Sequence, residues 1–282
     1  MPQSARLLIP RPALARCVFA AIYRDTRGLS LTDAQRFNHF PASPLVGVSV
    51  VFHGETRLVP MGATLDTARF AAPAARVMIA GPSTAPLSSW NPGAVQAISI
   101  GVFPDAWQRL TGTNAACLQD RISNDIPASI MGALGPASAP QDIEDFWQGF
   151  QDRLEIKWIK AGGAQDVSAF PRLADWTQHL LSQAAMSGPG RSLRSIERRV
   201  RRRVGQSPQA LASFAAIDRL HGLAVQGADQ PLARLALDAG FSDQSHMGRM
   251  VKRTTGFSPA RLNRMIQTNE AFWCYRLLGE RF

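Results

Sequence analysis

The stretch Ser192–Pro208, SLRSIERRVRRRVGQSP, has a second copy in Asp243–Pro259, DQSHMGRMVKRTTGFSP. The copies align when one is shifted by 51 residues, which places Gly205 on Gly256 and the following Ser-Pro pairs on each other. Each copy begins with polar residues that can cap a helix, continues as a basic amphipathic segment, and reaches a glycine that can end the helix. The repeat therefore predicts two short basic helices of the same design within one chain.

The net positive charge of the chain lies almost entirely in its C-terminal part. The 282 residues carry a formal charge of +10, and residues 172–282 hold 17 basic and 8 acidic side chains. Residues 1–171 hold 14 basic and 13 acidic side chains, so this part is close to neutral. Such an asymmetry is expected when one domain meets a polyanion and the other does not. We therefore expect the basic helices to contact nucleic acid.

An apolar helix is predicted in front of each basic helix. Leu173–Ala185 precedes the first one, and a helix capped by Asp229, with Pro231 in its first turn, precedes the second. Ser207–Ala224 has the periodicity of a longer helix that joins the two units. The side chains expected to turn inward from the basic helices are Ile196, Val200, Val204, Met247, Met250 and Val251. The C-terminal part is thus predicted to be all-α.

Two parts of the repeat carry a specific resemblance. Gly240–His246, GFSDQSH, followed by Lys252–Pro259, KRTTGFSP, resembles the second helix-turn-helix of the AraC/XylS family of bacterial transcription regulators, and Ser192–Val200 with Gly205–Pro208 resembles the first. The match covers about residues 172–266. The resemblance implies double-stranded DNA as a partner, RNA polymerase as another if the protein is an activator, and a variable N-terminal domain for a small-molecule effector or for homodimerisation.

Helix geometry and the resemblance together select the residues expected to contact DNA. In a helix-turn-helix unit, the first turn of the second helix and one residue a turn later reach the base edges. The expected base-reading residues are Arg194, Ser195, Arg198, Gln244, Ser245, His246 and Arg249. Arginine can pair with guanine, and glutamine with adenine, through two hydrogen bonds. Residues later in the same helices are expected to contact phosphates, namely Arg201, Arg202, Lys252 and Arg253.

The N-terminal half has the pattern of a strand-rich domain. Leu45–Phe52 is a β run, and a turn at His53–Glu55 predicts a hairpin with Thr56–Val59. Arg76–Ala80 and Val95–Phe103 are further expected strands. Several short strands separated by turns favour a small barrel or a sandwich, and the family resemblance implies a cupin-like barrel.

Helices and domain boundaries complete the predicted α+β, multidomain architecture. Asp142–Lys160 has an apolar stripe that is typical of a helix packed on a core, with a dimer face as the alternative. The expected parts are a regulatory, effector-binding or dimerisation domain at 1–160, a linker at 161–171, a double helix-turn-helix domain at 172–268 and a C-terminal extension at 269–282. The aromatic residues of the extension indicate docking onto the N-terminal domain or onto a partner.

A DNA-tethered, cupin-type enzyme is the first alternative function. It would place His39 and His53 on a metal ion, but the chain has no His-x-His pair, and isolated histidines are more often structural or surface residues. Cys274 lacks the Pro-Cys-His setting that an alkyl-accepting cysteine uses. A constitutive DNA-binding or interaction module without an effector is the second alternative.

The predicted function is that of a sequence-specific DNA-binding transcription regulator, not an enzyme, with neither metal nor cofactor. It is expected to read two successive major-groove faces and to respond to a small-molecule effector through its N-terminal domain. Trp90, Phe103 and Trp107 are candidates for an effector pocket, with core packing as the more frequent role. Three widely spaced cysteines and apolar runs too short for a bilayer favour a cytoplasmic protein without a membrane segment.

Overall fold

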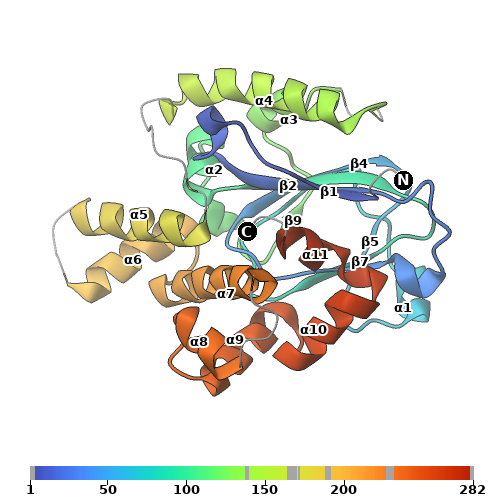
Figure 1. Cartoon of the computed structure of the whole chain (residues 1–282). Helices are drawn as coiled ribbons and strands as arrows, with labels where there is room; N and C mark the ends of the chain where they lie inside the picture. The colour runs from blue at the N-terminus through green and yellow to red at the C-terminus, as the bar shows by residue number, and fades with distance from the viewer. Residues whose placement is uncertain are drawn as a thin grey trace.

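A computed structural model describes residues 4–136, 140–163, 170, 172–187, 192–226 and 232–279 (Figure 1). Among these residues, strands and four α-helices form most of the N-terminal part, and those from residue 172 onward are mainly helical. In Figure 1, α4 (Ile143–Lys160) lies above the larger sheet, while the C-terminal helices from α7 (Pro208–Gln226) to α10 (Pro259–Thr268) lie below it. Within the described residues, no helix is both long enough and apolar enough to cross a membrane.

The larger sheet has six antiparallel strands in the order β1-β2-β8-β4-β6-β9. These strands are β1 (Ala5–Leu8), β2 (Val18–Asp25), β4 (Val46–His53), β6 (Val77–Ala80), β8 (Gln96–Val102) and β9 (Ile122–Ser123). In β4 and β8, alternate residues are buried on one face, which is the period of two that a sheet with one face on the core requires. The buried face includes Val48, Val50, Ile98 and Ile100.

The smaller sheet has three antiparallel strands in the order β3-β7-β5, which are β3 (Phe37–Phe40), β7 (Leu87–Trp90) and β5 (Arg57–Val59). The predicted hairpin between Leu45–Phe52 and Thr56–Val59 is therefore wrong. Both edges of β4 are already paired, with β6 and β8, so β5 crosses to the other sheet and pairs with β7. Within the described residues, the two open sheets do not close into a barrel.

Helices cover the outer face of the larger sheet. They are α2 (Pro104–Thr111), α3 (Ala128–Leu134) and α4 (Ile143–Lys160), whereas α1 (Leu65–Phe70) packs against β5 of the smaller sheet. Asp142 caps α4 by accepting a hydrogen bond from the Glu144 amide. The apolar stripe of α4 faces the core, where the ring of Phe146 lies 4.9 Å from that of Phe52. Core packing, rather than a dimer face, is thus the role of this stripe.

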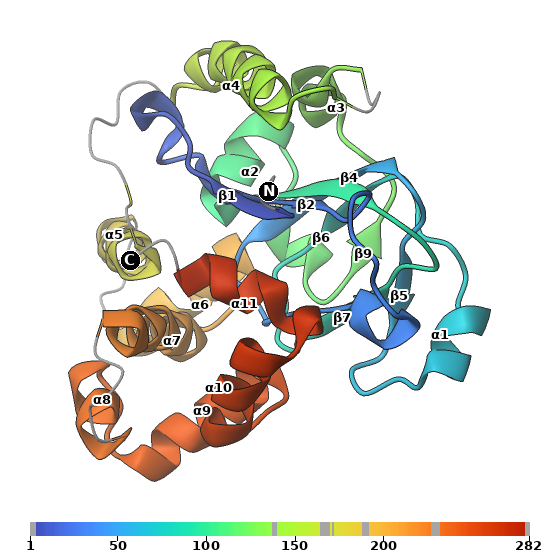
Figure 2. The ribbon, with the colours of Figure 1, turned by 45° about the vertical axis from the view of Figure 1, so that its right-hand side comes forward.

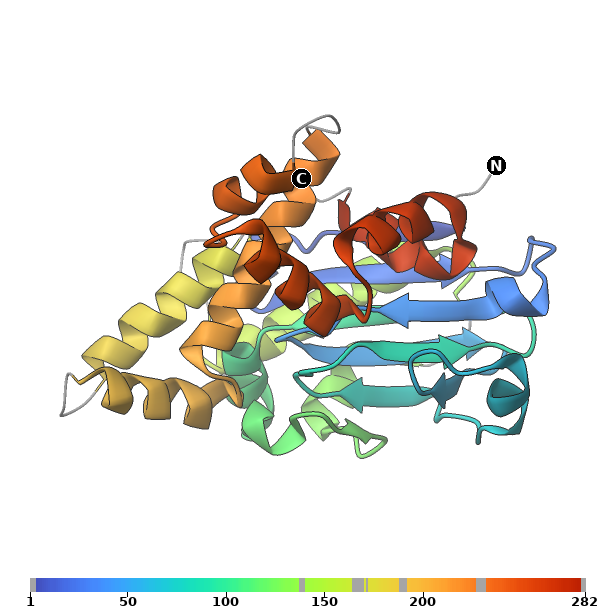
Figure 3. The ribbon, with the colours of Figure 1, turned by 90° about the horizontal axis from the view of Figure 1, so that it is seen from below.

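The C-terminal part has two helix pairs joined by α7, as the sequence predicts (Figure 2). The first pair is α5 (Leu173–Met186) with α6 (Leu193–Val204), and the second is α8 (Leu232–Asp238) with α9 (Gln244–Thr255). The joining helix is α7 (Pro208–Gln226). Figure 3 shows the yellow and orange helices of the first pair beyond the ends of the strands, with the red C-terminal helices beside the sheet.

The chain ends in α10 (Pro259–Thr268), a 3₁₀ turn at Glu270–Phe272 and α11 (Trp273–Gly279). This extension docks onto the N-terminal domain, which confirms one of the two roles expected from its aromatic residues. The indole N–H of Trp273 donates to Asn38 Oδ1 at 2.8 Å, and Glu270 pairs with Arg24 at 2.5 Å. The predicted linker lies partly outside the described residues, because only residues 161–163 and 170 of it are described. The expected cap at Asp229 and Pro231 also lies outside them.

Candidate functional site

The first basic helix, α6, presents a polar face between its two caps. Ser192 accepts a hydrogen bond from the Ser195 amide at the start, and Gly205 adopts a left-handed φ of 79° at the end. Val200 and Val204 are buried, with 0% and 1% of their surface exposed. Because the inner side is fixed by these apolar contacts, the arginines on the opposite side face solvent. The predicted capping and burial of α6 are confirmed.

The second basic helix, α9, repeats this arrangement. Asp243 accepts a hydrogen bond from the His246 amide at 2.7 Å, and this bond is the main cause that lowers the pKa of the Asp243 carboxyl. Gly256 ends the helix with a φ of 84°. Met247 and Val251 are buried against Phe241, the residue in the turn between α8 and α9. The same local rules therefore produce both basic helices.

The predicted base-reading residues all lie in the first two turns of α6 and α9. Arg194, Arg198, Gln244, Ser245 and Arg249 are exposed, while Ser195 and His246 are half-buried. The half-buried pair takes part in the caps, because the Ser195 hydroxyl lies 2.8 Å from that of Ser192 and His246 Nδ1 lies 3.1 Å from the Ser242 hydroxyl. These contacts orient the two side chains at the start of each helix.

The predicted phosphate contacts lie in the last turns and are also exposed. They are Arg201, Arg202, Lys252 and Arg253. Glu197 pairs with Arg201 at 3.1 Å across one helical turn. An exposed pair of this kind contributes little to stability, so Arg201 can exchange it for a phosphate at small cost. Cations at these positions also complement the helix dipole.

One exposed residue of α6 was not among the predicted contacts. Leu193 has 86% of its surface exposed, an unusual exposure for a large apolar side chain at the start of a polar helix. In the 51-residue register of the repeat, it occupies the position of Gln244 in α9. That register was the signal in the sequence that could have singled it out.

The N-terminal domain holds the C-terminal ends of both basic helices. Asn114 donates a side-chain hydrogen bond to the Arg202 carbonyl of α6 at 2.5 Å. The Ala42 amide donates to the Thr254 carbonyl of α9 at 2.8 Å. These bonds satisfy carbonyls that have no partner within their own helices at the C-terminal end. The pose of each basic helix therefore depends on the N-terminal domain.

The two units are attached to the N-terminal domain in different ways. The first shares its core, in which Trp176 of α5 packs on Phe103 with ring centroids 5.4 Å apart and donates to Asp105. The second has a small core of its own around Phe241. The first unit is thus continuous with the N-terminal domain, whereas the second meets it across an interface.

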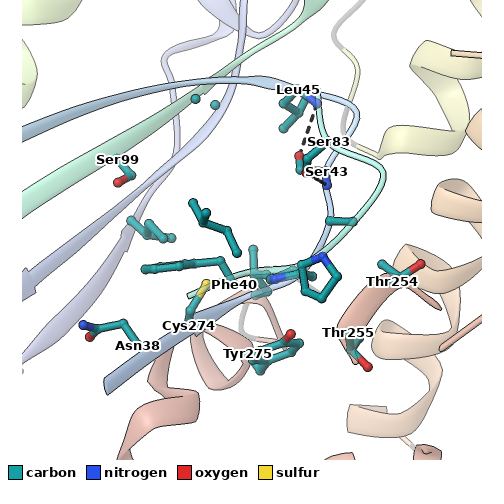
Figure 4. Close-up of a pocket in the computed structure, with 18 of the residues that line it drawn as sticks. Asn38, Phe40, Ser43, Leu45, Ser83, Ser99, Thr254, Thr255, Cys274 and Tyr275 are labelled. Atoms are coloured by element: carbon teal, nitrogen blue, oxygen red, sulfur yellow. Dashed lines mark hydrogen bonds between the residues drawn. The ribbon is translucent and has the colours of Figure 1, made fainter. Parts of the chain in front are cut away.

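A cavity of about 1070 Å³ lies at that interface (Figure 4). Its wall on the N-terminal side comes from β2, β4, β8 and the Phe40–Leu45 segment. Its wall on the C-terminal side comes from residues of α7, α9, α10 and α11, among them Ile217, Val251, Thr254 and Tyr275. The volume is at the upper end of the range for small-molecule sites.

The other side chains considered from the sequence lie elsewhere. Phe103 and Trp107 are fully buried in the main core and Trp90 in a smaller one, and none of the three is among the residues that line the large cavity. His39 bonds to the Ser88 hydroxyl at 2.8 Å, whereas His53 is exposed. Burial raises the pKa of the Cys274 thiol to about 12. Among the described residues, no group of three or more metal-ligating side chains is found.

The stability of the fold is expected to decrease in mild acid because of His39. Its ring packs 4.8 Å from that of Phe272 in the C-terminal extension, and burial lowers its pKa below the ordinary 6.5. The folded chain then binds this proton at lower pH than the unfolded chain. The stability that the buried, neutral His39 ring contributes is therefore present above about pH 6.5, and it is lost as the pH falls below that value.

Urea unfolding measured at about pH 8 and about pH 5.5 checks this expectation. The His39→Gln variant should lose less stability between the two conditions than the unsubstituted chain. His221, whose pKa burial also lowers, accounts for part of the remaining loss. An equal loss in both proteins would contradict the role given to His39.

Comparison with known proteins agrees with the C-terminal geometry. Residues 189–265 match a family model described as a helix-turn-helix domain. No curated protein matches the chain. An apo variant of ToxT from Vibrio cholerae has a TM-score of 0.42 at 12% identity, with 87% of this chain and 97% of that chain covered.

Two further ToxT structures from Vibrio cholerae are also similar. One has a TM-score of 0.39 at 12% identity, with 94% of this chain and 99% of that chain covered. The other, bound to an unsaturated fatty acid, has a TM-score of 0.36 at 12% identity, with 80% and 93% covered. With its two capped basic helices and the family match of residues 189–265, the chain carries a C-terminal helix-turn-helix domain of the AraC/XylS type.

Proposed function

We propose that the protein is a sequence-specific, DNA-binding transcription regulator of the bacterial cytoplasm in which α6 and α9 read two successive major-groove faces. The observation that carries the proposal is the repeated helix, capped at both ends, with its apolar side buried and its polar and basic side exposed. The joining helix α7 has 19 residues and is therefore about 28 Å long. This length is comparable to one turn of B-DNA, about 34 Å.

The base contacts are assigned to the exposed first turns. Arg194, Ser195 and Arg198 read one half-site, and Gln244, Ser245, His246 and Arg249 read the other. A bidentate pair between arginine and guanine discriminates by about 1–3 kcal/mol. No catalytic step is assigned to the chain. A homodimer, and contact with RNA polymerase if the protein is an activator, are further parts of this proposal.

The experiment that tests the proposal is selection from a pool of randomised duplexes at near-physiological salt, with sequencing of the bound fraction. A site with two separate blocks of preferred bases is the expected product. Binding that enriches no sequence and fades with added salt would mean that the basic faces are only an electrostatic patch. That outcome would overturn the regulator proposal.

The phosphate contacts lead to an expected change in salt dependence. Lys252→Ala should weaken binding to the selected site and to an unrelated duplex by the same factor. It should also reduce the slope of the logarithm of affinity against the logarithm of salt concentration by about one. Fluorescence anisotropy at four or more salt concentrations measures both quantities. A change of base preference in the variant would instead place Lys252 among the base-reading residues.

Leu193 is expected to recognise a thymine methyl group. It is exposed at the helix position equivalent to Gln244, and apolar side chains contact that methyl in the major groove. Leu193→Ala should therefore relax the preference at one base pair in the first half-site, without changing the salt slope. Replacing the thymine by uracil in that position removes the methyl, and it should cost the unsubstituted protein affinity but not the variant. Equal losses in both proteins would contradict this role.

An effector is proposed to act through the interface cavity. A molecule bound there touches β4 and β8 on one side and α9 on the other. Since the first unit is continuous with the N-terminal core, a bound molecule changes the pose of the second unit relative to the first. Binding of the effector and binding of DNA then influence each other by the same factor.

A further inference from the structure

The charged groups that line the cavity are balanced in number. Its lining includes the cations Arg24 and Arg121 and the anions Asp120 and Asp218. Arg24 pairs with Glu270 at 2.5 Å and stacks on Trp273 at 5.1 Å. Arg121 is exposed to solvent. The charge of the buried cation, Arg24, is therefore compensated by Glu270, although its Nε atom has no hydrogen-bond partner, and Arg121 lies at an exposed part of the lining.

The two aspartates of the lining already accept hydrogen bonds. Asp120 accepts from the Thr84 amide at 2.6 Å and from its hydroxyl, and Asp218 accepts from the Leu173 amide at 3.2 Å. His221 adds no charge near neutral pH, because burial lowers its pKa. An ionic head group buried in such a site loses its hydration, and an acidic one must compete with Glu270 for the buried Arg24. The cavity thus disfavours ligands of either charge.

Besides Arg24 Nε, one more buried polar atom of the lining residues has no hydrogen-bond partner, the hydroxyl of Tyr275. Tyr275 has 4% of its surface exposed, and its hydroxyl makes no hydrogen bond. Burial raises the pKa of this phenol, so that it keeps its proton and can donate. Buried polar atoms are nearly always satisfied in folded proteins. In Figure 4, Tyr275 lies on the C-terminal side of the cavity with Thr254 and Thr255.

A second polar group in the cavity wall is a pair of serine hydroxyls on the larger sheet. Ser49 of β4 and Ser99 of β8 face each other in register, and their hydroxyl oxygens are 2.8 Å apart. A hydroxyl has one donor and two acceptor positions, so the pair retains a donor after this bond. Apolar side chains that line the cavity include Phe40, Leu45 and Ile217.

We infer that the cavity binds an uncharged, mostly apolar ligand whose oxygen acceptor receives a hydrogen bond from Tyr275, with Ser49 and Ser99 meeting a second polar group. The inference rests on the proposed effector site and names the chemical class of its ligand. An ester, ether, ketone or alcohol can accept the hydrogen bond from Tyr275, and its hydrocarbon part can contact the apolar side chains. A carboxylate or an ammonium group does not suit this lining.

Four matched probes test the inference on the full chain: methyl decanoate, decan-1-ol, decanoate and decylammonium, each used below its aggregation limit. Their binding is measured by calorimetry and by displacement of the neutral dye Nile red. The two uncharged probes should bind at least tenfold more tightly than the two ions. Tighter binding of decanoate, or no binding of any probe, overturns the inference.

Two tyrosine variants locate the ligand. Tyr275→Phe should weaken binding of methyl decanoate by about two- to tenfold, the value of one hydrogen bond. Tyr23→Phe is the matched control, because Tyr23 is also buried but does not line the cavity. Ser99→Leu, which fills the sheet side, should weaken all probes. An unchanged affinity in Tyr275→Phe, with a folded spectrum, removes Tyr275 from the site.

Selection from the duplex pool separates failure of this inference from failure of the proposed function. If the protein enriches a DNA site but binds none of the probes, the ligand class is wrong and the regulator proposal stands. If it binds the uncharged probes but enriches no DNA, the cavity is a ligand site and the regulator proposal falls.

Discussion

Replacement of Trp273 by alanine should lower the free energy of unfolding by about 3–5 kcal/mol, the usual loss when a large aromatic side chain is removed from a core. Trp273 is 5% exposed, and its ring packs edge-on against Phe40 with centroids 5.9 Å apart. It also lies under the Arg24 guanidinium and donates to Asn38. The substitution therefore removes an apolar contact and leaves the buried Asn38 oxygen without its donor.

Chemical denaturation followed by circular dichroism measures this loss. Trp273→Phe is the control, because it keeps most of the apolar volume and loses only the indole donor. That variant should lose about 1–3 kcal/mol, the cost of a buried acceptor left unpaired. A loss below about 1 kcal/mol for the alanine variant would mean that the extension does not dock as described.

Replacement of Arg198 or Arg249 by alanine should each reduce affinity for the selected DNA site by about 10- to 100-fold, the value of one bidentate contact with guanine. The two arginines occupy equivalent positions in the repeat and are exposed on α6 and α9. Each substitution should relax the preferred bases in one half-site and leave the other half-site unchanged. Repeating the selection with each variant measures affinity and preference together.

Arg69→Ala is the matched control for charge. Arg69 is an exposed arginine of the N-terminal domain that pairs with Asp33 at 2.7 Å. Its loss changes the net charge as much as the loss of Arg198 but leaves α6 and α9 intact. If Arg69→Ala reduced site affinity as much as the other two substitutions, the arginines of α6 and α9 would contribute only through net charge.

Features that depend on neighbouring residues were predictable from the sequence. The caps at Ser192 and Asp243 and the left-handed glycines at 205 and 256 follow from residues within one turn of each helix end. The repeat supplied a second, independent reading of the same pattern. For this reason the helical units were placed correctly, and the side chains expected on their outer faces are exposed except for the half-buried Ser195 and His246.

Features that depend on distant pairing were not predictable in the same way. The hairpin with β5 failed because the strands beside β4 are β6 and β8, which lie far away in the sequence. Strand β2, with the sequence VFAAIYRD, is buried along most of its length and has no clear alternation, so periodicity alone does not distinguish it from a helix. The cavity exists only because the second unit meets the sheet across an interface.

The central claim, that one chain reads two successive major-groove faces, is tested most directly by changing the spacing of the selected half-sites. Insertion of about five base pairs between them turns the second half-site to the opposite side of the duplex. Because α7 fixes the separation of α6 and α9, we predict that affinity falls to the level of a duplex with a single half-site. Unchanged affinity after the insertion would contradict the account.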